Sequence, residues 1–128
     1  STAKITSQHG LFYDYLLMSE GEQKAKQYLE ANELAIRNIE KIIQEEKIEC
    51  EYEKQDAYVF TNQEAEIPKI EKEVEVVKKL GLEAEFVTKS ELPIPILGAI
   101  KFPNQAQFNP CKYANRISKK YARKSRII

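Results

Sequence analysis

Neutral hydrogen-bonding side chains gather in one weakly charged stretch of this sequence. Residues 92–110, LPIPILGAIKFPNQAQFNP, contain a single charged residue, Lys101, although 31% of the chain is charged. Neutral amides follow the apolar part of this stretch at Asn104, Gln105 and Gln107. An apolar surface with a few such groups is typical of a ligand pocket. A buried structural strand also avoids charge, so the stretch predicts either a pocket or a part of the core.

The other residue types that carry out chemistry are sparse or badly spaced. Ser7, His9 and Asp14 lie close together in sequence, and their spacing predicts no catalytic triad. The four glycines stand at positions 10, 21, 81 and 98, so the chain contains no glycine-rich loop that could cradle a phosphate. Cys50 and Cys111 lack the spacing of metal ligands or of a disulfide framework. We expect both thiols to be reduced and no metal to bind.

The composition is that of one ordinary globular domain. The chain has 128 residues, 42% of them hydrophobic, and its 20 basic and 20 acidic side chains cancel. A chain of this length can bury roughly two-thirds of its surface without help from disulfides or metals. No run approaches the roughly 18 apolar residues of a membrane span, and no leader sequence is recognisable. We therefore expect a single cytoplasmic domain, residues 1–128, that binds no membrane.

Hydrophobic periodicity predicts helices and then strands in the first half of the chain. Residues 11–18, LFYDYLLM, fit a short buried helix. Residues 20–46 repeat apolar side chains every three or four positions, as an amphipathic helix does. IECEYEK, residues 48–54, alternates along its length, which is typical of a strand with one wet face. Residues 54–56 are then predicted to be the turn of a hairpin into a strand at 57–61.

The second half continues with the same two kinds of element. Residues 67–80 fit a helix with Ile70 and Val77 on one face, and Gly81 can end it. A short strand is predicted at residues 83–88.

A longer strand and a helix complete the predicted fold. Residues 96–102 do not alternate, which predicts a strand buried on both faces. Asn109 is expected to cap a helix that starts at Pro110, and residues 125–128 begin a last strand. Together the elements predict an α+β fold in which helices pack on one face of a mainly antiparallel or mixed sheet.

Basic side chains are concentrated near the end of the sequence. Residues 112–128 carry seven basic side chains and no acidic one. Nucleic-acid-binding domains usually carry a basic excess over the whole domain, whereas this chain has zero formal net charge. We expect a solvated helix face and no nucleic-acid partner.

Two stretches carry a resemblance to a known family. STAKITSQHGLFYDYL (1–16) and LGAIKFPNQAQFNPCKYANRI (97–117) resemble segments of FAD-dependent oxidoreductases of the glycine oxidase and D-amino-acid oxidase (DAO) type, in particular the bacterial subgroup often fused to a Rieske domain. The likeness covers essentially all 128 residues. In this family a Rossmann half that binds FAD precedes the first stretch. The resemblance implies that the chain is the substrate-binding middle region of a larger flavoprotein, without its dinucleotide-binding half.

The resemblance also implies roles for particular residues. The first stretch passes close to the flavin in the family, which gives as cofactor-binding candidates Ser1, Thr2, Ala3, Lys4 and Thr6. Small and hydroxyl-bearing residues suit a place where the backbone must approach a phosphate or ring. The second stretch lies over the substrate side of the ring, which gives as substrate-binding candidates Asn104, Gln105 and Gln107. A water-poor pocket of this kind suits hydride transfer. We expect His9 to be structural.

The activity that the resemblance implies is oxidation of an amine or amino-acid-like substrate by hydride transfer to the flavin. The family commonly holds the substrate carboxylate with arginine, but no arginine lies between Arg37 and Arg116, which leaves the substrate open. The isolated chain is expected to bind no FAD, to show no oxidase activity, and to be able to self-associate through surfaces that the flavin domain would cover. The alternative is a non-enzymatic interaction module that docks a partner through the long acidic helix or the basic end.

Overall fold

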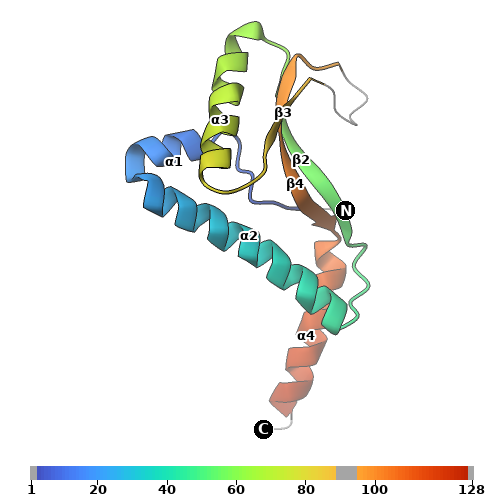
Figure 1. Ribbon diagram of the computed structural model, residues 1–128. Coiled ribbons are helices and arrows are strands. Elements are labelled where there is room, and N and C mark those ends of the chain that lie inside the picture. Colours follow the sequence, from blue (N-terminus) through green and yellow to red (C-terminus); the bar gives the residue numbers. More distant parts are fainter. Residues whose placement is uncertain (1–2, 89–94, 127–128) are drawn as a thin grey trace.

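The computed structural model describes residues 3–88 and 95–126, with side chains up to residue 120. It contains a four-stranded antiparallel sheet, three α-helices on one side of that sheet and a fourth helix that extends away from it (Figure 1). This arrangement confirms the predicted α+β fold with helices on one face. The elements in chain order are β1 (Ala3–Ile5), α1 (Tyr13–Glu20), α2 (Glu22–Glu45), β2 (Glu53–Thr61), the 3-10 turn η1 (Glu64–Glu66), α3 (Ile67–Lys79), β3 (Glu85–Val87), β4 (Gly98–Phe108) and α4 (Pro110–Arg126).

Strand β4 is the centre of the sheet, and each of the other three strands pairs with it in the antiparallel direction. Strand β2 follows one edge of β4 from Gly98 to Gln107. The other edge is shared, because β3 pairs with residues 99–101 and β1 with residues 106–108. The beginning of the described chain therefore lies beside the C-terminal end of β4 (Figure 1).

The strand register separates a face covered by helices from an open one. Ile100 of β4 packs into the main hydrophobic core under α1–α3, together with its cross-strand neighbours Val59 and Phe86. Because side chains alternate along a strand, the next residue, Lys101, projects to the opposite side of the sheet. We call this side the open face.

The main core lies between the sheet and helices α1–α3. Helices α2 and α3 begin and end within two residues of their predicted bounds, and Ile70 and Val77 are both buried, as their spacing predicts. Leu29 of α2 belongs to the same cluster. The apolar stripes of two amphipathic helices thus close over one face of the sheet.

Helix α1 is less buried than its apolar sequence predicts. Tyr13 is fully buried, but Tyr15 and Met18 are 65% and 81% exposed. The helix packs against α2 and α3 at the rim of the molecule, so only part of its circumference reaches the core.

The predicted hairpin turn at residues 54–56 is wrong. Strand β2 is continuous, and its register with β4 shifts at Asp56, where two residues of β4, Pro103 and Asn104, form a β-bulge opposite this one residue. Lys54, before the bulge, reaches α2, and Ala57, after it, enters the main core on the same side. The bulge therefore breaks the alternation of side chains just as a turn would. Residues 48–52 form no strand.

The end of α3 follows the sequence prediction. Gly81 has a φ of 109°, which a residue with a side chain rarely adopts. The backbone N–H of Leu82 donates to the carbonyl of Val77 at 3.2 Å, which is the pattern of a helix that ends at a glycine. The short strand predicted next is β3.

Strand β4 is longer at its C-terminal end than predicted. It continues through Phe108, so Asn104, Gln105 and Gln107 all belong to the strand. Gly98, Ala99 and Ile100 are buried, as predicted for the start of the strand. Lys101 departs from that expectation, because it is only half-buried.

Helix α4 begins as predicted and ends later. The Asn109 side-chain oxygen accepts the backbone N–H of Lys112 at 3.1 Å, which caps the helix. Tyr113 and Ile117 pack on a second hydrophobic cluster around Ile43, at the far end of α2. The helix continues through Arg126, so residues 125 and 126 are helical rather than the start of a strand, and residues 127–128 lie outside the described chain.

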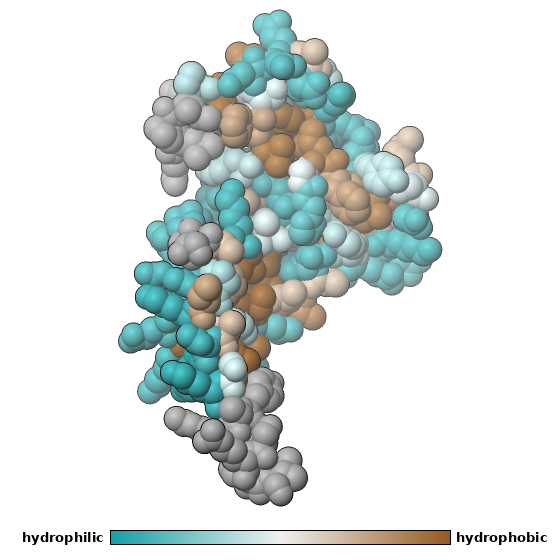
Figure 2. Space-filling view, turned by 180° about the vertical axis from the view of Figure 1, so that it is seen from behind, coloured by the Kyte–Doolittle hydropathy of each residue, from teal (hydrophilic) through white to brown (hydrophobic). Residues whose placement is uncertain are grey.

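The main core is separate from two smaller hydrophobic clusters near the far end of α2. Seen from behind, the molecule shows apolar surface in an upper area and again in a lower one toward α4, with hydrophilic surface between them (Figure 2). The lower clusters pack Ile5, Ile36 and Ala106 together, and next to them Ile43, Ile48 and Cys50. Polar side chains occupy the space between α2 and the bulge of the sheet, and the candidate site is built around them.

Three general features of the described residues bear on function. None of the described helices is long and apolar enough to cross a membrane. Within residues 3–88 and 95–126, no group of histidine, cysteine and acidic side chains could hold a metal ion. Cys50 is buried and Cys111 is exposed, and both are free thiols.

Candidate functional site

The two sequence stretches that resemble flavoenzymes meet in the sheet. Lys4 of β1 stands directly opposite Gln107 of β4, and Glu53 of β2 flanks Gln107 on its other side. The Gln107 side-chain nitrogen donates to the Glu53 carboxylate at 3.1 Å. The neighbouring pair, Ile5 and Ala106, packs toward α2, so Lys4 and Gln107 project from the open face. Lys4 is exposed and forms no ion pair with another described side chain.

Gln105 is buried, and its amide group is already fully bonded. Its oxygen accepts hydrogen bonds from the Thr6 hydroxyl at 2.9 Å and from the backbone N–H of Ser7 at 2.7 Å. Its nitrogen donates to the Glu33 carboxylate at 3.1 Å and to the Pro103 carbonyl at 2.9 Å. The residue is 1% exposed. Gln105 therefore joins three segments of the chain and keeps no hydrogen-bonding group for a ligand.

The segment Thr6–Gln8 fills the gap that β1 and β3 leave along the edge of β4. The Gln8 side chain donates to the carbonyl of Ile100 at 3.4 Å, and the Tyr13 hydroxyl donates to the carbonyl of Ser7 at 2.5 Å. The Thr6 hydroxyl oxygen also accepts the backbone N–H of Gln8 at 2.9 Å. This segment, which follows the cofactor-side candidates in sequence, is thus held from several directions.

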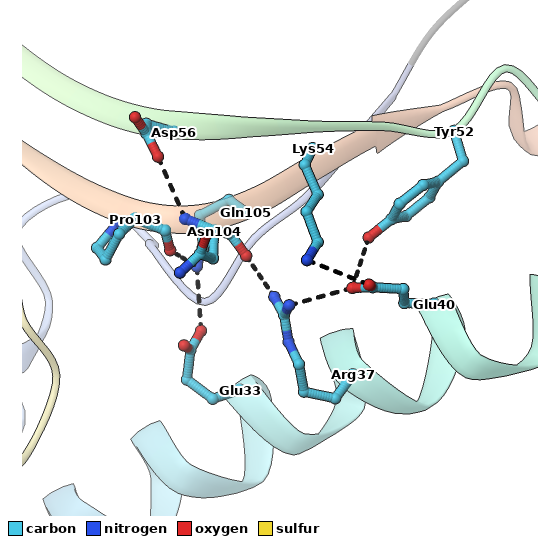
Figure 3. A network of polar contacts seen from close by, with 9 residues as sticks. All are labelled: Glu33, Arg37, Glu40, Tyr52, Lys54, Asp56, Pro103, Asn104 and Gln105. Atoms are coloured by element: carbon cyan, nitrogen blue, oxygen red, sulfur yellow. Dashed lines mark hydrogen bonds and ion pairs between the residues drawn. The ribbon is translucent and has the colours of Figure 1, made fainter.

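Asn104 lies in the bulge with a left-handed backbone. Its φ is 55°, and its backbone N–H donates to the Asp56 carboxylate at 3.2 Å. Its carbonyl accepts a hydrogen bond from the Arg37 guanidinium of α2 (Figure 3). Bulges of this kind redirect side chains and are common beside active sites. The Asn104 side chain is exposed at the bulge, beside Asp56.

A charged cluster on α2 supports the bulge from the covered side of the sheet. Glu40 accepts hydrogen bonds from Arg37 at 3.1 Å and from the Tyr52 hydroxyl at 3.0 Å, and pairs with Lys54 at 3.3 Å (Figure 3). Burial alone would raise the pKa of Glu40, but the bonds from Tyr52 and Lys54 and the nearby positive charges outweigh it and lower the pKa. Burial, together with the bond to Glu40, raises the pKa of Tyr52 to about 12.

A depression of about 300 Å³ is lined by Glu53, Lys54, Gln55, Asp56 and Asn104. Beside it, Lys4, Thr6, Gln55, Asp56, Gln105 and Gln107 line a small hollow of about 20 Å³. That volume holds roughly one water molecule, whereas ligand pockets commonly measure about 300–1,000 Å³. A larger molecule would therefore lie against the open face, with its other side covered by something else.

Lys101 lies on a part of the open face for which the sequence predicted no functional residue. Its ammonium pairs with Asp56 at 3.4 Å, and it stands between Tyr58 of β2 and Glu85 of β3. The hydrogen bond and the charge of Asp56 raise the pKa of Lys101. The sequence held a signal for this position, because a lone charge inside an apolar strand indicates that one side of the strand is accessible.

The remaining candidates have simpler surroundings. Ser1 and Thr2 lie outside the described residues. Ala3 is half-buried and pairs with Phe108 in the sheet. His9 is exposed, and its ring lies edge-on to that of Tyr28, with the centroids 6.0 Å apart.

A comparison with protein families identifies the family of the chain. The sequence model of the FAD dependent oxidoreductase family, DAO, matches residues 1–125. The chain therefore belongs to the FAD-dependent oxidoreductase family, which implies FAD as the cofactor of the full-length protein.

The chain is also similar to part of a longer curated protein. Over 126 residues, 97% of this chain, it is 39% identical to a Bacillus subtilis (strain 168) protein named as a Rieske 2Fe-2S iron-sulfur protein, YhfW. The chain spans 24% of the length of that relative. No solved structure matches.

Proposed function

We propose that this chain is the substrate-binding region of a FAD-dependent oxidoreductase, with substrate and flavin placed against the open face of the sheet. The pairing of β1 with the C-terminal half of β4 carries this proposal, because it places Lys4 beside Gln107 on a face that α1–α3 do not cover. The match to the oxidoreductase family favours this function over the alternative of a non-enzymatic interaction module.

The residues at this end of the sheet fit a flavin cofactor as one wall of its site. FAD carries two phosphates and a flat ring with donors and acceptors at its edge. The exposed ammonium of Lys4 supplies a positive charge, and the extended backbone of β1 allows close approach. The small hollow beside them implies that the rest of the flavin site lies outside these residues. Bound FAD supplies the acceptor for a hydride from a substrate C–H bond next to nitrogen or oxygen.

The open face offers acceptors that suit an amine or amino-acid-like substrate. Gln107 donates its side-chain N–H to Glu53, and no described residue donates to its carbonyl oxygen, which can accept an N–H of the substrate. Glu53 adds negative charge that favours an ammonium group, whereas the carboxylate of Asp56 is paired with Lys101. Arg37 does not supply a carboxylate clamp here, because its guanidinium is bonded to Glu40 and to the Asn104 carbonyl beside α2.

The structure suggests different roles for the three amide candidates. Gln107 is the one that can contact substrate, Asn104 lies at the edge of the open face in the bulge, and Gln105 holds the Thr6–Gln8 segment in place. The chain's own part in catalysis is therefore to orient the substrate and to exclude water on one side of the ring.

The proposal is tested on the full-length protein. We expect the purified protein to show the absorption of bound FAD, and we expect this absorption to bleach under anaerobic conditions with one or more members of a panel of primary amines, N-methyl amines and amino acids. Gln107→Ala should retain FAD and slow bleaching by about tenfold, the effect of about 1.4 kcal/mol. Gln27→Ala, on the exposed side of α2, is the matched control. A colourless protein would refute the flavoenzyme assignment, and wild-type bleaching in Gln107→Ala would remove that residue from the site.

A further inference from the structure

We infer that Glu33 of α2 is a positioning residue for the cofactor-side segment Thr6–Gln8 and acts on it through Gln105 and Ser7. One carboxylate oxygen of Glu33 accepts the Ser7 hydroxyl at 2.8 Å and the Gln105 side-chain nitrogen at 3.1 Å. Figure 3 shows Glu33 pointing from α2 toward Gln105. The inference rests on the proposed function, because it assigns the segment a place beside the flavin.

The chemistry of the partners allows only one orientation of the Gln105 amide. A carboxylate and a backbone carbonyl can only accept hydrogen bonds, so the amide nitrogen must face Glu33 and Pro103. The amide oxygen must then face the backbone N–H of Ser7, which can only donate. The Thr6 hydroxyl donates to the same oxygen. The negative charge of Glu33 thus determines how two residues of the segment are held.

Glu33 acts at a distance from any ligand on the open face. It belongs to α2, which lies on the covered face, and it contacts the segment directly at Ser7 and indirectly, through Gln105, at Thr6. Gln105 and Ser7 are 1% and 0% exposed respectively. In Glu33→Gln a neutral amide oxygen, a weaker acceptor than a carboxylate, faces the Ser7 hydroxyl and the Gln105 nitrogen. The segment is still held by Tyr13 and by the Gln8 contact to β4. We therefore expect a displaced segment in a folded protein, rather than loss of the fold.

The test uses the full-length protein loaded with FAD and the variant Glu33→Gln. Glu30→Gln, exposed on the same helix, is the control. We expect Glu33→Gln to shift the visible flavin spectrum and to lower kcat/KM by between about tenfold and a hundredfold, as misplaced groups near reacting atoms do. Glu30→Gln should match the wild type in both readouts.

A double variant separates positioning through Gln105 from a general loss of stability. In Gln105→Ala the amide that Glu33 orients is absent. Adding Glu33→Gln to Gln105→Ala should therefore lower kcat/KM by no more than about threefold further, the effect of less than 1 kcal/mol.

The outcomes distinguish the inference from the function on which it rests. If the wild-type protein holds FAD but Glu33→Gln matches Glu30→Gln in spectrum and kinetics, the positioning role is refuted. The same conclusion follows if Glu33→Gln lowers only the melting temperature, or if it lowers kcat/KM as much in Gln105→Ala as in the wild type. A wild-type protein without FAD refutes the proposed function, and the positioning role with it.

Discussion

The buried carboxylate of Glu73, on α3, accepts the backbone N–H groups of Tyr13 and Asp14 at 2.9 and 2.8 Å, at the start of α1. The residue before this helix, Phe12, supplies no side-chain cap. A side chain sixty positions later thus takes the role that a local serine or aspartate usually has. Helix α1 is thereby joined to α3 by charge as well as by apolar contact.

Removing this remote cap should destabilise the protein. Glu73→Ala leaves buried N–H groups of α1 without an acceptor, and we expect a loss of about 2 kcal/mol in the free energy of unfolding. Denaturant unfolding followed by circular dichroism measures this loss. Glu71→Ala, exposed on the same helix, should change stability by less than about 0.5 kcal/mol. Equal stabilities of the two variants would show that Glu73 does not cap α1.

Tyr52 should make the stability fall at high pH. Its pKa is raised to about 12 from 10.0, chiefly by burial and then by its bond to Glu40. The folded protein therefore holds the phenol proton more tightly than the unfolded chain, so this contribution is fully present below pH 10 and is lost as the pH rises through about 12. We expect the difference in free energy of unfolding between the wild type and Tyr52→Phe to shrink as the pH rises from 10 to about 12. A difference that is constant from pH 9 upward would contradict the assignment.

Gly98 is required by the packing of β4 against its neighbours. A Cβ at this position would lie 2.6 Å from the Phe86 ring and 2.8 Å from the end of the Ile67 side chain. We expect Gly98→Ala to cost about 2 kcal/mol of unfolding free energy, as overpacked cores do. Combining it with Phe86→Leu frees space and should restore part of that loss. If the effects of the two substitutions on the free energy of unfolding are simply additive, Phe86 is not the side chain that obstructs the new methyl group.

Lys4 should contribute to cofactor retention through its charge. In the full-length protein, Lys4→Met removes an exposed cation, and we expect the FAD dissociation constant to rise about fivefold, which corresponds to about 1 kcal/mol. The difference from wild type should shrink at high salt because exposed charges are screened. Lys26→Met, an exposed lysine on α2, is the control. An unchanged dissociation constant at low salt would place the phosphates elsewhere.

The helices were predictable because their information is local. The apolar residues of α2 and α3 recur with the helical period over 24 and 13 residues, and Gly81 and Asn109 give recognisable signals at helix ends. The turn predicted within β2 is wrong because the irregularity at Asp56 comes from a bulge in β4, where Pro103 and Asn104 stand opposite this one residue, and the chain does not reverse. The strand partners could not be deduced, since β4 pairs with β1 across almost the whole sequence.

The sequence predicts which candidates are neighbours better than it predicts their contacts. The resemblance of two stretches gives Lys4 and Gln107 as candidates, and the sheet brings these two residues together, while their roles stay predictions. The sequence does not show that the Gln105 amide already has hydrogen-bond partners inside the protein, because those partners, Ser7 and Glu33, lie far away in sequence. An amide in a polar stretch has the same appearance in sequence whether it faces a ligand or the interior.

The central position of β4 determines the order in which the chain can fold during synthesis. Each described strand pair includes β4, so no part of the sheet can form until Gly98–Phe108 has left the ribosome. Until then the nascent chain can form only the helices α1–α3, and the segments of β1 and β2 remain unpaired. Truncated chains that end before β4 should therefore be helical, sheetless and exposed to premature association.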